Sequence, residues 1–191
     1  MECNYFEDKK IEKLNFIEKT LPFGVYENCI FLNCDFSNAD LSNFSFAECR
    51  FSDCNISMAK LIKVTFNDVA FTGCKLLGLH FEDCNKTPFI ISFENCILNF
   101  SSFYKQKLKK IVFKNSEIRE ADFTDADLSA AIFDHCDLTK TKFENTILEK
   151  ADFRTSFNYS INPELNKIKK AKFSMPGIIG LLDKYDIEIE N

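Results

Sequence analysis

Cysteine, histidine and carboxylate side chains are the residues of this sequence that could carry out chemistry. The chain has 9 Cys, 2 His and 29 Asp and Glu residues. A zinc site would show Cys-x-x-Cys pairs, but none occurs, and the cysteines follow intervals of five and twenty residues, as in Cys34, Cys54 and Cys74. The sequence therefore predicts no metal site and no cofactor, with the thiols acting as small apolar side chains in a reduced protein.

The two histidines offer little material for catalysis. His80 and His135 are expected to point outward from opposite sides of the molecule, so they cannot converge on one site. No glycine-rich phosphate loop and no Gly-x-Ser-x-Gly motif is present. We therefore expect no catalytic residues and no enzymatic activity.

A five-residue period is the element that positions all of these side chains. Every fifth residue from Phe6 to Phe81 is large and apolar, and a second run in the same step starts at Phe93 and reaches Phe173, interrupted by Asn158 and Pro163. The residue two places earlier is small through much of the chain. A period of five fits neither a helix nor a flat strand, so it indicates a chain that turns a corner every pentapeptide.

Four corners close a coil of 20 residues, and residues 20 apart share chemistry. One side reads Ile11, Phe31, Phe51, Phe71, Phe93, Phe113, Phe133, Phe153 and Phe173. Such stacks predict an all-β solenoid, a four-sided parallel β-helix filled by aromatic rings. They also account for the composition, with 22 Phe and no Trp.

Two parts of the chain depart from the period. Two extra residues fall within 85–92, which we interpret as a bulge inside one solenoid spanning residues 1–173. Residues 174–191 are expected to form a cap: a short helix with Ser174 as N-cap and Pro176 in its first turn, then a strand over 186–190. The cap offers an apolar surface for a possible homodimer, through Ile178, Ile179, Leu181 and Leu182.

The repeat unit resembles a known family. Ser37-Asn38-Ala39-Asp40-Leu41-Ser42-Asn43 and Ala121-Asp122-Phe123-Thr124-Asp125-Ala126-Asp127-Leu128-Ser129 are similar to the Ala-Asp/Asn-Leu-x-x unit of pentapeptide repeat proteins. The resemblance implies a right-handed quadrilateral β-helix. It also implies a layout like that of the Qnr-type and MfpA-type quinolone-resistance proteins, DNA-mimicking rods that bind DNA gyrase and dimerise through a helix-containing C-terminal tail.

The charges bear on that analogy. The net charge of −5 argues against direct nucleic-acid binding. The side of the coil that contains Phe6 and Tyr26 carries a negative strip in its first half and mostly lysine in its second half. The strip, a candidate partner-binding surface, consists of Glu7, Asp8, Glu27, Glu48 and Asp68. A DNA mimic should be acidic along its whole length, and this face is not.

Two functions follow as alternatives. The first is a rigid, non-catalytic scaffold for a protein partner, and the second is a DNA-mimicking modulator of DNA gyrase or topoisomerase IV. The N-terminus has no export signal and no stretch is long and apolar enough to span a membrane, so we expect a cytoplasmic location.

Overall fold

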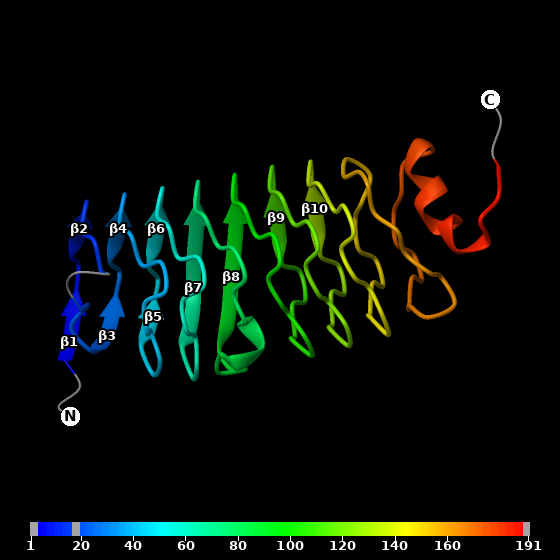
Figure 1. Cartoon of the computed structure of the whole chain (residues 1–191). Helices are drawn as coiled ribbons and strands as arrows, with labels where there is room; N and C mark the ends of the chain where they lie inside the picture. The colour runs from blue at the N-terminus through cyan, green and yellow to red at the C-terminus, as the bar shows by residue number, and fades with distance from the viewer. Residues whose placement is uncertain (1–3, 17–19, 189–191) are drawn as a thin grey trace.

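The computed structural model describes residues 4–16 and 20–188 and shows a rod built of stacked coils (Figure 1). Its strands are short and its helices are of the 3-10 type. The strands are β1 (Asn4–Glu7), β2 (Lys10–Glu12), β3 (Gly24–Glu27), β4 (Ile30–Leu32), β5 (Ser45–Ala47), β6 (Arg50–Ser52), β7 (Thr65–Thr72), β8 (Phe89–Glu94), β9 (Val112–Lys114) and β10 (Ile132–Asp134). The helices are η1 (Phe81–Asp83), η2 (Pro176–Leu181) and η3 (Asp183–Tyr185).

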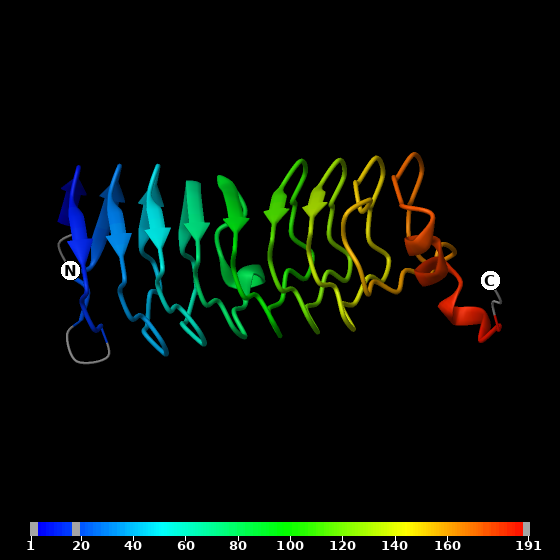
Figure 2. The ribbon, with the colours of Figure 1, turned by 90° about the horizontal axis from the view of Figure 1, so that it is seen from above.

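Every strand pair is parallel, and its register matches the predicted coil length. Phe31 pairs with Phe51, and Phe113 pairs with Phe133, in each case 20 residues on. Isolated bridges continue the same step on the faces without strands, as between Lys107 and Asp127. Seen from above, the coils succeed one another along a single axis (Figure 2). The parallel β-solenoid predicted from the five-residue period is confirmed.

We number the four faces of the solenoid in chain order by their inward residues. The first face contains Phe6, Tyr26, Phe46, Phe66, Leu108, Leu128, Leu148 and Ile168, and the second, third and fourth begin at Ile11, Phe16 and Leu21.

Stacked phenylalanine rings fill the interior. On the second face the rings of Phe113 lie 5.3 Å from Phe93 and 5.0 Å from Phe133, and are nearly parallel to both. Rings on neighbouring faces meet edge to face, as Phe113 meets Phe123 at 6.0 Å. Both arrangements are favoured by the charge distribution of an aromatic ring.

Each corner turns through one residue with a left-handed backbone. These residues stand two places after the inward residue, as Asn33 (φ 52°) follows Phe31. The residue before the inward position often closes the turn, because its side-chain oxygen accepts a hydrogen bond from the backbone N–H two residues on. Asp35 does so for Ser37 at 2.8 Å, and Asp122 does so for Thr124 at 2.8 Å.

The two-residue change of spacing is absorbed between β7 and β8. Phe66 pairs with Phe89, but Val69 pairs with Ile91, so the step falls from 23 to 22 residues within one strand pair. Helix η1 and a cis Thr87–Pro88 bond lie just before β8. Beyond β8 the step of 20 is restored.

The interrupted coil changes its inward residues. Asn158 turns outward, and its Nδ2 donates to Asp137 at 3.0 Å. Tyr159 and Ile161 are buried in its place, and the ring of Tyr159 packs against Phe153 and Phe173.

The chain after Phe173 lies at the C-terminal end of the rod (Figure 1). Ser174 accepts a hydrogen bond at its Oγ from the backbone N–H of Gly177 at 3.1 Å, as expected of a residue that starts a helix. The strand expected over 186–190 is wrong for residues 186–188, because Asp186 has a left-handed backbone (φ 48°) that turns the chain after η3. Residues 189 and 190 lie outside the described part. In the residues described, no helix is long and apolar enough to cross a bilayer.

Candidate interaction surfaces

The acidic residues of the first face form two adjacent columns. Glu7 of β1 pairs in register with Glu27 of β3. Asp8, Glu48 and Asp68 occupy left-handed corner positions one residue further along the chain, and all three are exposed. The structure thus brings together the five carboxylates predicted from the sequence. None has a cation partner among the described residues.

Hydrogen bonds hold the first part of this strip in place. The Tyr5 hydroxyl donates to Glu27, and this bond raises the pKa of Tyr5 to about 12. The Nδ2 atom of Asn28 donates to Asp8 Oδ1 at 2.6 Å. The columns are therefore ordered negative surfaces.

Lysines occupy the same face in the second half of the rod. Bridges connect Lys107 to Asp127, Asp127 to Ile147 and Ile147 to Lys167, which carries the first outward column to the last coils. The exposed lysines of these coils are Lys107, Lys109, Lys110, Lys150, Lys167, Lys169 and Lys170. Within the described residues only Lys109 among them makes an ion pair, to Asp127 at 3.3 Å.

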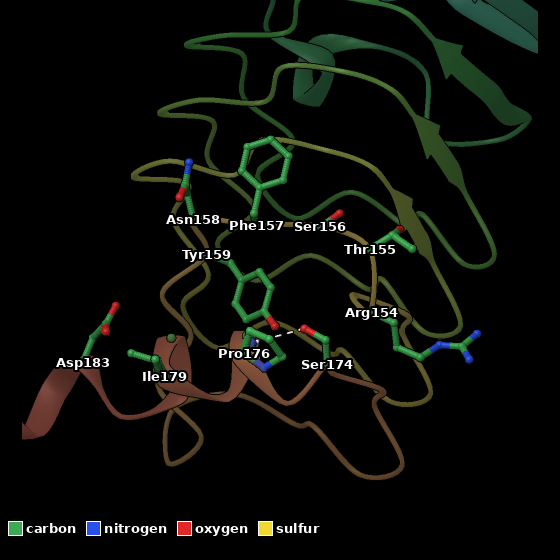
Figure 3. Close-up of a pocket in the computed structure, with 12 residues that line it drawn as sticks. Arg154, Thr155, Ser156, Phe157, Asn158, Tyr159, Ser174, Pro176, Ile179 and Asp183 are labelled. Atoms are coloured by element: carbon green, nitrogen blue, oxygen red, sulfur yellow. Dashed lines mark hydrogen bonds between the residues drawn. The ribbon is translucent and has the colours of Figure 1, made fainter. Parts of the chain in front are cut away.

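The C-terminal segment divides the four residues predicted for dimerisation. Ile178 and Ile179 are exposed, whereas Leu181 packs against the core of the rod and Leu182 is half-buried. A groove of about 560 Å³ runs between this segment and the interrupted coil. Figure 3 shows Tyr159 pointing across it towards Ser174 and Pro176.

No arrangement of catalytic or metal-binding type appears in the described residues. His80 and His135 are exposed on opposite faces, and each contacts a carboxylate of its own coil, Glu82 at 2.9 Å and Asp134 at 2.8 Å. No group of three potential metal ligands occurs in residues 4–16 and 20–188.

The described thiols are all buried and unpaired. Burial raises the pKa of Cys49 to about 12 and that of Cys136 to about 11. Such thiols remain protonated and inert at neutral pH, as expected of small residues inside a core.

A family model described as a pentapeptide repeat region matches residues 26–91 and 89–157. The chain belongs to the pentapeptide repeat family. Among curated protein sequences none gives a significant match.

Two solved pentapeptide repeat structures are similar to this one in fold. The first is HetL, involved in heterocyst differentiation regulation in the cyanobacterium Nostoc sp. strain PCC 7120; it is 13% identical, with a TM-score of 0.72, over 90% of this chain and 86% of HetL. The second is QnrB1, a plasmid-mediated fluoroquinolone resistance protein; it is 19% identical, with a TM-score of 0.51, over 96% of this chain and all of QnrB1. At these identities the comparisons establish the fold.

One surface of this pentapeptide repeat protein was not anticipated. At the corner between the third and fourth faces, Met58 and Phe100 are each 60% exposed, with Gly78 stacked between them. The Met58 side chain lies over Gly78, and Ile62 and Tyr104 stand exposed nearby on the fourth face. The signal was present in the sequence, because large apolar residues at corner positions cannot enter the core.

Proposed function

We propose that this protein is a non-catalytic scaffold that binds a protein partner through its outer surface and works in the cytoplasm. The observation that carries the proposal is the apolar corner formed by Met58, Phe100, Ile62 and Tyr104. Contiguous exposed apolar side chains on a rigid surface are typical of protein interaction sites. The packed interior and the two separated histidines add support, since they offer no cleft for a reaction.

The test replaces the apolar corner without disturbing the fold. Asn is well tolerated in a left-handed backbone, so Met58→Asn combined with Phe100→Asn should fold normally. In-cell crosslinking followed by mass spectrometry should recover specific partners with the native protein and lose them with this variant. Lys140→Asn, at a corner of another region, is the matched control. Identical crosslinked sets for the native protein and the double variant would refute the apolar corner as the docking site.

The acidic strip favours a second candidate function, modulation of DNA gyrase or topoisomerase IV by DNA mimicry. QnrB1, whose fold is similar, is a fluoroquinolone resistance protein. Coils rise by roughly 4.8 Å, so the ordered carboxylates of the strip form a negative line with a regular spacing, as DNA phosphates do.

A supercoiling assay with purified gyrase tests this second candidate directly. The native protein should inhibit supercoiling or protect the enzyme from a fluoroquinolone, and Glu7→Lys, Glu48→Lys and Asp68→Lys together should abolish the effect. No inhibition and no protection at any protein concentration would rule the candidate out.

A further inference from the structure

The first face has a symmetry of charge that neither proposed function uses. Its outward segments succeed one another along the rod as 5–8, 25–28, 45–48, 65–68, 89–91, 107–110, 127–130, 147–150 and 167–170. The segment 89–91 stands in the middle, with equal numbers of segments on each side. Acidic residues occupy the segments before it and lysines the segments after it.

A twofold axis across the middle segment would superimpose these opposites. If two copies lie face to face and antiparallel, the first segment of one copy meets the last segment of the other, and each outward column meets itself. Glu7 then faces Lys169, and Asp8 faces Lys170, because each pair shares a column of the repeat. All four side chains are exposed.

The same operation matches the segments nearer the axis. Asp68 faces Lys110, both at corner positions with left-handed backbones. Ile90, which is 56% exposed, lies at the axis and meets its own copy. An apolar contact at the centre with a charged rim is the usual anatomy of a specific protein interface.

The match has one unfavourable position. Glu27 faces Glu149, although Lys150 and Lys169 lie beside the latter on the same face. Glu48 faces Ala130 and gains no direct partner. Of the four carboxylates and cations brought closest together, the favourable contacts outnumber the like-charge contact.

We propose that two copies of this chain associate antiparallel through their first faces, with the twofold axis at Ile90. The acidic segments of each copy bind the lysine segments of the other. The inference stands apart from the proposed partner binding, which uses the corner between the third and fourth faces.

The dimer should be weak and sensitive to salt. Eight steps of roughly 4.8 Å give a contact about 38 Å long, but the face is only one pentapeptide wide, which is a small interface. Exposed ion pairs contribute little each and are screened over about 10 Å at 0.1 M salt. Their main effect is to fix partner and register.

The experiment uses two charge-reversed forms of the full chain. The acidic form carries Lys110→Glu, Lys169→Glu and Lys170→Glu, and the basic form carries Glu7→Lys, Asp8→Lys and Asp68→Lys. Sedimentation velocity at about 20 mM salt should show dimer for the native protein, and its dissociation constant should rise about tenfold or more at high salt. Each reversed form alone should be monomeric, and an equimolar mixture of the two should restore a dimer.

Controls separate this interface from others. Lys13→Glu, Lys75→Glu and Lys140→Glu make the same change of charge away from the first face and should leave the dimer intact. Ile179→Lys tests the alternative in which the C-terminal segment dimerises, and it should have no effect. A native monomer at low salt, a dimer that survives either reversal, or a mixture that stays monomeric would each overturn the proposal, provided that circular dichroism shows the variants folded.

Discussion

At the scale of single residues, the inward phenylalanines carry the stability of the rod. Phe113 is fully buried and stacked between Phe93 and Phe133, so truncation leaves a cavity that rigid neighbouring coils cannot fill. We expect Phe113→Ala to lower the free energy of unfolding by about 3–5 kcal/mol in urea titrations. Lys109→Ala, which removes only an exposed ion pair, should cost less than about 1 kcal/mol. Equal losses for the two variants would contradict this assignment of the core.

The buried thiols give a second prediction at this scale. Their raised pKa values and burial should keep the eight described cysteines unreactive towards a disulfide reagent at pH 8 in the native protein. They should all react once denaturant unfolds the chain. The measurement is the thiol count by absorbance before and after unfolding. Rapid reaction of several thiols in the native state would show that the coils open locally.

At the scale of the structural element, the unit is one pentapeptide with its corner. The left-handed residues include Asn, Asp, Gly and Lys, but no β-branched residue among those described. We expect Asn33→Gly to change stability by less than about 0.5 kcal/mol and Asn33→Val to cost about 1–2 kcal/mol, because a β-branched side chain clashes in this conformation. Thermal unfolding of both variants distinguishes a backbone effect from the loss of the Asn side chain.

The Asp that closes a turn makes the element sensitive to pH. Burial alone would raise the pKa of Asp137, but hydrogen bonds from Thr139, Asn158 and Arg119 outweigh burial and hold that pKa below its ordinary value. A carboxylate with a lowered pKa stabilises the fold above its unfolded pKa of about 3.9, and the contribution disappears as the pH falls through the lower folded value. Asp137→Asn should therefore reduce the melting temperature at pH 7, and the gap to the native protein should narrow below about pH 4. A gap independent of pH would exclude a charged Asp137 as its cause.

Prediction from sequence succeeded where the period was intact. Inward and outward positions, the 20-residue register and the alignment of the acidic strip all follow from counting in fives, since each coil repeats the previous geometry. Counting fails in the interrupted coil, where Tyr159 and Ile161 enter the core instead of Asn158. Which side chain fills that space depends on contacts with Phe153 and Phe173, which no local pattern encodes.

At the scale of the whole molecule, the rod has two ends where its stack of coils stops. Each coil contacts only its neighbours, so an open end exposes core and backbone groups that must be covered. At the C-terminal end, the Ile161 N–H donates to the Gly180 carbonyl at 2.8 Å, and Leu181 packs against the core. We infer that the segment after Phe173 acts as the cap of this end.

Gly180 provides the test of the cap, because its lack of a side chain lets the segment approach the coil. A Cβ atom at this position would lie 2.0 Å from the carbonyl oxygen of Tyr159, which is far too close. We expect Gly180→Ala to displace the segment, to speed hydrogen exchange at the Ile161 amide by about tenfold or more, and to leave exchange in the central coils unchanged. Ile178→Ala, on the exposed side of η2, should leave both unchanged. If Gly180→Ala left the Ile161 amide protected, the contact between Gly180 and the last coil would not hold the cap in place, and Leu181 alone would have to do so.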